Sequence, residues 1–168
     1  MLMALLYFAY GSNMSTRRLR ARVRSADLLS IAALPGHQMR FHKVGRDGSA
    51  KCDAFATGDS SHRLFGVLFS IAAAERPALD RHEGCGNGYE RKRVVLDLPN
   101  GTTAEAFTYY ATHIDPALGP FGWYREHVLR GAREHRLAVE HIRMIEQIEV
   151  VDDLEPGRHD RELAIYMR

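Results

Sequence analysis

The order of its apolar segments most constrains what this chain of 168 residues can fold into. Short strand-like patterns follow one another through its first two thirds, and helical patterns separate only some of them. This order predicts an α+β fold in which a mixed sheet curls into a small β-barrel with flanking helices, rather than a doubly wound parallel sheet. We expect strands at residues 3–9, 26–34, 39–44, 52–57, 63–71, 89–98 and 102–112, and helices at 15–23 and 72–83.

The last third is predicted to be helical from about residue 122 to 150, with a break near Gly131 or Leu137. A polar segment follows, and the apolar residues 163–167 predict one added strand. Within the strand at 63–71, Gly66 indicates a bulge or the close approach of another backbone segment. A chain of this length is expected to form a single domain, residues 1–168, with its own core.

Composition argues against several classes of protein. With 45% hydrophobic residues, 26% charged residues and a net charge of +2, the chain is an ordinary globular protein without a signature of nucleic-acid binding. No apolar run approaches the roughly 18 to 20 residues of a membrane span. Two isolated cysteines, Cys52 and Cys85, favour reduced thiols and a cytoplasmic location. The oligomeric state stays open, with a homodimer among the alternatives.

The N-terminal segment offers the first candidate site. An apolar strand ends abruptly at Gly11, and Ser12 and Asn13 precede an arginine-rich helix. A strand, a glycine and a helix start in this order aim free backbone N–H groups at one point, where they can hold a carboxylate or a developing oxyanion. The alternative is an ordinary strand-to-helix turn in which Asn13 or Ser15 is the N-cap.

Glu83 is the second candidate, at the end of the helix expected at 72–83 and just before Gly84. A carboxylate there faces the negative end of the helix, which disfavours its ionised form. If burial also removes it from water, its pKa rises toward neutrality, where the group can both take and give a proton. The alternative is an exposed glutamate in the last helical turn before a C-cap glycine.

Thiol and metal chemistry are weaker alternatives. Cys85 and His82 lie close together at a helix end, but no third group is available to orient them as a nucleophilic pair. His82 and Glu83 are followed by Gly86 where a zinc-binding motif would place its second histidine. We therefore expect neither a metal nor a catalytic cysteine.

Two further features remain open at the level of sequence. The aromatic ring of Tyr124 belongs either to the core or to the mouth of a pocket. The arginine-rich run 17–24 lacks interleaved aromatic residues and is interpreted as a solvated helix face rather than a nucleic-acid site. On that face we expect four exposed side chains: Arg17, Arg18, Arg20 and Arg22.

Together these pieces resemble the gamma-glutamylcyclotransferase-like family. The resemblance rests on Tyr7–Met14 at the start of the chain and on Leu79–Gly84 about 70 residues later. It is supported by Gly88–Arg91, which leads into a strand. The resemblance implies a compact barrel of mixed strands with flanking helices. It also implies an enzyme that converts a γ-glutamyl amide or dipeptide to 5-oxoproline and a free amine or amino acid, a reaction of the carbon–nitrogen lyase type.

The resemblance also assigns roles. Glu83 matches the family's catalytic glutamate and would act as general acid and base, without a metal or a cofactor. The loop of Tyr10, Gly11, Ser12, Asn13 and Met14 would bind the glutamyl group, together with Tyr124 from the helical segment. The loop at residues 113–122 is expected to close over the pocket.

The chemistry fits these residues, because the nucleophile is the substrate's own α-amine. The enzyme has to hold that amine near the γ-carbonyl, stabilise an oxyanion and transfer a proton to the leaving nitrogen. Two alternatives are a non-catalytic barrel that binds a small metabolite and an interaction module that uses the arginine-rich helix. That helix is either plain surface or a feature that favours an anionic tail on the substrate.

Overall fold

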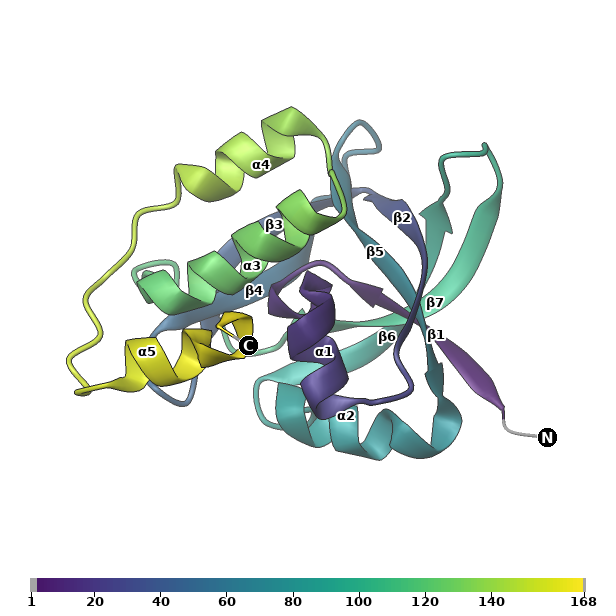
Figure 1. Ribbon diagram of the computed structural model, residues 1–168. Coiled ribbons are helices and arrows are strands. Elements are labelled where there is room, and N and C mark those ends of the chain that lie inside the picture. Colours follow the sequence, from purple (N-terminus) through teal and green to yellow (C-terminus); the bar gives the residue numbers. More distant parts are fainter. Residues whose placement is uncertain (1–2, 168) are drawn as a thin grey trace.

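The computed structural model describes residues 3–167 and is built around a closed barrel of five strands (Figure 1). Neighbouring strands are antiparallel, except that β7 lies parallel to β1 and closes the barrel. The expected small mixed barrel is therefore confirmed. Around the barrel the strands lie in the order β1 (Ala4–Ala9), β5 (Arg63–Ala72), β2 (Asp27–Pro35), β6 (Tyr89–Asp97) and β7 (Thr103–Ala111).

A hairpin outside the barrel consists of β3 (His37–Val44) and β4 (Ala50–Ala56). Asp53 fastens it to the barrel, because its Oδ1 accepts the backbone N–H of Ala111 at 2.7 Å. The other carboxylate oxygen of Asp53 lies 2.7 Å from Nε2 of His42, and both residues are buried. Ala111 is the last residue of β7, and β7 runs parallel to its neighbour β1. The ends of the two strands therefore lie at the same end of the barrel, and the hairpin lies beside the segment that follows β1.

The helices form three groups along the chain. η1 (Ser12–Met14) and α1 (Thr16–Arg22) follow β1, and η2 (Ala73–Glu75) and α2 (Arg76–Glu83) follow β5. Figure 1 shows α1, α3, α4 and α5 together on one side of the barrel. None of the helices described is long and apolar enough to cross a membrane. The last group, after the barrel, is α3 (Gly122–Glu134), α4 (Val139–Glu146), α5 (Arg158–Leu163) and η3 (Ala164–Tyr166).

Two caps determine where the candidate site residues lie. The Oγ of Ser15 accepts the backbone N–H of Arg18 at 3.4 Å, so Ser15 is the N-cap of α1. At the other end of the site, α2 stops at Gly84, which has a φ of 73° and a left-handed conformation that glycine adopts without steric cost. The caps leave the loop after β1 and the last residue of α2, Glu83, free to face each other.

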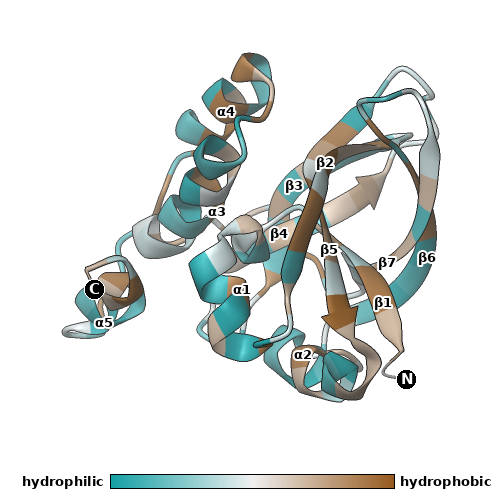
Figure 2. Cartoon of the chain, turned by 45° about the vertical axis from the view of Figure 1, so that its right-hand side comes forward, coloured by the Kyte–Doolittle hydropathy of each residue, from teal (hydrophilic) through white to brown (hydrophobic). Residues whose placement is uncertain are grey.

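The core lies inside the barrel and between the barrel and α3. Figure 2 shows hydrophobic residues concentrated along the barrel strands, among them β2 and β5. Phe8 and Phe69 are among the largest fully buried side chains. Gly66 allows β1 and β5 to approach, because a Cβ atom at this position would lie 2.5 Å from the carbonyl oxygen of Ala9 and 2.7 Å from the ring of Phe8. The close backbone approach expected at Gly66 is thereby confirmed.

The structure corrects two expectations about helices and strands and decides between two alternatives for a third. Residues 163–167 do not add a strand to either sheet; residues 158–166 form α5 and η3 instead. The helix expected at 72–83 begins only at Arg76, since Ala72 extends β5 by pairing with Ala4. The break expected in the C-terminal helical region, near Gly131 or Leu137, is confirmed at Leu137, since Gly131 lies inside α3.

Gly131 marks a tight crossing of α3 over η1. A Cβ atom there would lie 2.5 Å from Cβ of Met14 and 2.6 Å from the backbone nitrogen of Ser15. Replacing Gly131 by alanine is therefore expected to destabilise the protein by about 1–3 kcal/mol, although alanine is the better helix former. Thermal unfolding of the purified variant measures this effect.

Gly122→Ala is the matched control, because Gly122 is the first residue of the same helix and has no atom within 4 Å of an added Cβ. We expect its thermal midpoint to stay at or slightly above that of the wild type. Equal midpoints for the two variants would show that α3 and η1 do not depend on this close contact.

Candidate active site

A small polar chamber of about 20 Å³ lies where β1 ends. Glu83, Cys52 and the loop Gly11–Asn13 form part of its wall. The rest of the wall is made by tyrosines from β1, β6, β7 and α3 and from the residue that follows β1: Tyr7, Tyr10, Tyr89, Tyr109 and Tyr124. The chamber thus brings together both candidate segments of the sequence, which are about 70 residues apart.

The loop Gly11–Asn13 supplies backbone donors to this chamber. Within the described part of the chain, the N–H groups of Gly11, Ser12 and Asn13 donate to no other residue. Gly11 is required by close packing rather than by its φ of −108°, since an added Cβ would lie 3.1 Å from Cβ of Cys52 and 3.5 Å from the hydroxyl of Tyr124. The arrangement offers unused N–H groups to an anionic or carbonyl oxygen.

Glu83 reaches the loop from the end of α2. The side-chain amide of Asn13 donates a hydrogen bond to its Oε1, and Nη1 of Arg22 lies 4.0 Å from the same oxygen. Only 17% of the side-chain surface of Glu83 is exposed. Burial raises the pKa of this carboxyl group, while the positive charges of Arg22, Arg18 and Lys43 lower it by a smaller amount.

The tyrosines are held as neutral phenols. Burial is the main reason why the pKa of Tyr10, Tyr89 and Tyr124 lies well above its ordinary value. The hydroxyl of Tyr124 accepts the backbone N–H of Cys52 at 3.0 Å, whereas that of Tyr10 donates to the carbonyl of Tyr109 at 2.6 Å. These hydroxyls can orient a bound group by hydrogen bonding, and they do not serve as bases near pH 7.

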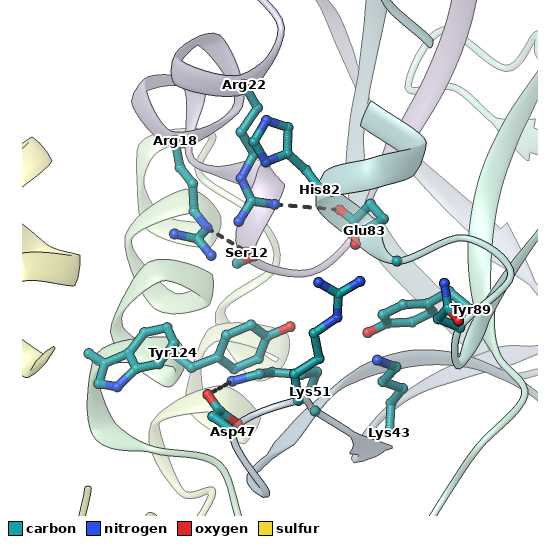
Figure 3. A pocket seen from close by; sticks show the side chains of 15 residues that line it. Ser12, Arg18, Arg22, Lys43, Asp47, Lys51, His82, Glu83, Tyr89 and Tyr124 are labelled. Atoms are coloured by element: carbon teal, nitrogen blue, oxygen red, sulfur yellow. Dashed lines mark hydrogen bonds and ion pairs between the residues drawn. The ribbon is translucent and has the colours of Figure 1, made fainter. Parts of the chain in front are cut away.

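A second, larger cavity of about 220 Å³ opens from the chamber, with which it shares Ser12, Glu83, Tyr89 and Tyr124 (Figure 3). Its wall carries only two carboxyl groups within the described chain, those of Glu83 and Asp47. Five cationic side chains from α1 and the β3–β4 hairpin surround it: Arg18, Arg22, Lys43, Arg46 and Lys51. We call this cavity the outer pocket, and its charge distinguishes it from the inner chamber.

Two of the arginines correct the expectation of a solvated helix face. Arg18 and Arg22 lie one turn apart on α1 and point into the outer pocket, with 13% and 19% of their side-chain surface exposed. Arg17 and Arg20 are exposed as expected. The spacing of four residues places Arg18 and Arg22 on one helix face, but the sequence does not say which face meets the barrel.

Arg18 is held by the C-terminal part of the chain. Its Nε donates to Oγ of Ser12 at 3.2 Å, and its Nη1 lies 3.1 Å from Nε2 of His127. Nδ1 of His127 lies 2.7 Å from the hydroxyl of Tyr166 in η3, and Glu162 of α5 lies 3.5 Å from Nη1 of Arg18. Segments that are remote in sequence thus hold this guanidinium against the loop after β1.

The lysines come from the hairpin, on the side of the outer pocket opposite Arg22 and Glu83 (Figure 3). Nζ of Lys51 lies 2.8 Å from Asp47 and 4.6 Å from the ring centre of Trp123. Nζ of Lys43 lies 4.5 Å above the ring of Tyr89. No local sequence motif marks these two lysines, since only the docking of the hairpin onto the barrel directs them to the pocket.

Some expected site residues lie elsewhere. Met14 is fully buried beneath α3 and lines neither cavity. None of the residues of the loop at 113–122 lines the outer pocket, whose wall includes Gly45–Asp47 instead. Cys85 is a free thiol outside both cavities, while His82 lines the outer pocket.

Comparison with known proteins agrees with this geometry. The family described as gamma-glutamyl cyclotransferase, AIG2-like, matches residues 7–126. The chain belongs to this family. The match includes the loop after β1, Glu83 and Tyr124, and it ends within α3, before α4 and α5.

Individual relatives are distant. Proteins named gamma-glutamylcyclotransferase from Bos taurus and Homo sapiens are each 28% identical to this chain over 151 residues, covering 88% of it and 80% of their own length. A solved structure named gamma-glutamyl cyclotransferase superposes with a TM-score of 0.87 at 23% identity. That superposition covers 99% of this chain and 100% of the other, so the gamma-glutamyl cyclotransferase fold extends over the whole described chain.

Replacing Glu83 by glutamine is expected to raise the thermal midpoint at neutral pH. A carboxyl group whose pKa is higher in the folded than in the unfolded protein opposes folding once it is ionised, so the cost develops as the pH rises above the ordinary value of 4.5. The glutamine variant avoids this cost. Its advantage over the wild type is therefore expected to disappear as the pH is lowered below that value, as measured by thermal unfolding across the range.

Glu126→Gln provides the control for this comparison. Oε1 of Glu126 pairs with Nε of Arg130 at 2.8 Å on the surface of α3, where such pairs contribute about 0.2–1 kcal/mol. Its effect on the midpoint is expected to be small and, at neutral pH, opposite in sign. A Glu83→Gln protein that is less stable than the wild type at pH 7 would contradict the proposed cost of burying this carboxylate.

Proposed function

We propose that this protein converts a γ-glutamyl amide or dipeptide to 5-oxoproline and releases the corresponding amine or amino acid. The observation that carries the proposal is the meeting of a buried carboxyl group, Glu83, with the unused N–H groups of Gly11–Asn13 at one chamber. Membership of the gamma-glutamyl cyclotransferase family and the names of its relatives support the same conclusion. The reaction needs no nucleophile from the protein, because the substrate attacks itself.

The two cavities suggest how the substrate lies. A space of about 20 Å³ holds one polar group about the size of a water molecule. We assign to it the γ-carbonyl oxygen, which becomes the oxyanion and meets the N–H groups of Gly11–Asn13. The remaining atoms of the substrate then extend past Glu83 and Tyr124, which line both cavities, into the outer pocket.

Glu83 would transfer the protons of the reaction. As a carboxylate it takes a proton from the α-ammonium group, and the free amine attacks the γ-carbonyl carbon to close a five-membered ring. The ring nitrogen loses a second proton, the bond to the leaving nitrogen breaks, and that nitrogen receives both protons. Since Glu83 ends as the carboxylate it was, a pKa raised toward neutrality suits both halves of the cycle.

Other residues fit this scheme as positioning groups. Ser12 and Tyr124 line both cavities, and Tyr10 lines the inner chamber, so we propose that they orient the glutamyl group. Cys52 also lines the chamber, but burial raises the pKa of its thiol and keeps it neutral. Both cysteines are free, which is consistent with the reducing cytoplasm that we propose as the protein's location.

The Glu83→Gln variant tests the proton transfer. Loss of a general acid and base is expected to lower the rate of 5-oxoproline formation by about 100- to 10,000-fold. The amide keeps the size of the side chain, so binding of 5-oxoproline, measured by calorimetry, is expected to survive. Glu126→Gln serves as the control with unchanged turnover, and an active Glu83→Gln enzyme would remove this residue from the mechanism.

Substitution of Gly11 tests the donor loop. In Gly11→Val the new side chain would press on Cys52 and the hydroxyl of Tyr124 and displace the N–H groups that follow. Loss of oxyanion stabilisation is expected to lower the rate of 5-oxoproline formation by about 100- to 1,000-fold. Gly11→Ala, whose single Cβ meets Cys52 at 3.1 Å, is expected to be affected less.

Gly122→Val is the control for this series, because a Cβ at that position meets nothing within 4 Å. Turnover and thermal midpoint are measured on the same preparation of each variant. A folded Gly11→Val protein with full activity would mean that the loop is only a turn.

A further inference from the structure

The outer pocket contains a buried cation without a carboxylate partner. Lys43 is only 5% exposed, and within residues 3–167 no carboxylate oxygen lies within 4.0 Å of its ammonium group. Gly88 leaves room for it, since a Cβ there would lie 2.9 Å from Cε and 3.1 Å from Nζ of Lys43. A buried charge without a partner is costly, so its position at the wall of a cavity points to an anionic ligand.

The other cations of the pocket divide into two kinds. Arg18, Arg22 and Lys51 each have a carboxylate within 4.0 Å, in Glu162, Glu83 and Asp47 respectively. Arg46, on the rim, resembles Lys43 in having no ion pair with any residue of the described chain. Within residues 3–167, Lys43 and Arg46 are therefore left without a carboxylate oxygen inside 4.0 Å, although Glu83 attracts Lys43 from farther away.

Both cations belong to the β3–β4 hairpin, but the side chain of Arg46 reaches the end of α2, where its Nη2 would lie 3.9 Å from a Cβ at Gly84, the residue next to Glu83. Lys43 belongs to β3 and Arg46 to the loop that joins β3 to β4, whereas Glu83 ends α2. Figure 3 shows Lys43 and Glu83 on different sides of the cavity, so a substrate that presents its scissile bond to Glu83 would extend its leaving group toward the hairpin. The leaving group is thus the part of the substrate that meets the unpaired cations.

We propose that the preferred substrates are γ-glutamyl dipeptides whose leaving amino acid carries two carboxylates. This inference rests on the proposed function. Lys43 and Arg46 would each pair with one of these carboxylates. The two cations differ in geometry, since an ammonium group is a point charge and a guanidinium a planar fork, and each can hold a carboxylate of its own.

The decisive comparison is between γ-glutamyl-glutamate and γ-glutamyl-glutamine, which have nearly the same size and differ by one charge. Charge-assisted hydrogen bonds predict that wild-type kcat/KM is about 10- to 100-fold higher for γ-glutamyl-glutamate. The preference is expected to decrease as potassium chloride is added, because salt screens the rim of the pocket. A ratio of one or below would overturn the inference and leave the proposed function standing.

Variants locate the effect. Lys43→Met keeps the aliphatic stem and removes the charge, and Arg46→Gln removes a charge from an exposed loop position where folding is not at risk. Each is expected to reduce the glutamate-to-glutamine ratio of kcat/KM at least several-fold, mainly by raising KM for γ-glutamyl-glutamate. Arg20→Gln, an exposed arginine of α1 outside the pocket, is the control that keeps the ratio. An unchanged ratio in both pocket variants would overturn the assignment.

A binding measurement separates this inference from the proposed function. If no γ-glutamyl compound, including γ-glutamyl-alanine and glutathione, gives 5-oxoproline, the proposed function is overturned. Calorimetry of the two dipeptides with Glu83→Gln then judges the pocket alone. Tighter binding of γ-glutamyl-glutamate that is lost on adding Lys43→Met supports the dicarboxylate site, and equal affinities overturn it.

Discussion

The contact between Asn13 and Glu83 is the interaction on which the site depends. It joins the loop that follows β1 to the last residue of α2, and it places a carboxyl group beside the unused N–H groups of Gly11–Asn13. Both partners reach this point because α1 is capped at Ser15 and α2 stops at Gly84. The N-cap starts α1 after the loop and the C-cap glycine ends α2 at Glu83, so both segments are available to line the chamber.

Burial and positive charge act on Glu83 in opposite directions. Burial favours the protonated carboxyl, whereas Arg22, Arg18 and Lys43 favour the carboxylate, and burial has the larger effect. A group balanced in this way can change its protonation state during a reaction at modest cost. The same cations also line the outer pocket, so the charges that tune the proton carrier are available to an anionic leaving group.

Much of the fold could be predicted from the sequence because its signals are local. The alternation of apolar and polar residues predicts β3, and the apolar run predicts β5. The glycine after Glu83 likewise predicts the end of α2. The expected strand at 163–167 was wrong because tertiary contacts override the local apolar pattern: this segment is helical and places the hydroxyl of Tyr166 against His127 and Ser15. Likewise, the end of β5 at Ala72 is set by its pairing with Ala4.

The sequence by itself determined the two motifs of the site, because a glycine turn before a helix and a glutamate before a capping glycine are written in consecutive residues. Only the tertiary structure decided that Arg18 faces the pocket while Arg17 faces solvent, since that choice depends on which side of α1 packs against the barrel. It also decided that Lys43 is buried at the pocket wall, because no local sequence pattern predicts where the hairpin docks on the barrel. The sequence thus determines which charged residues the protein carries, and tertiary packing determines which of them face the pocket.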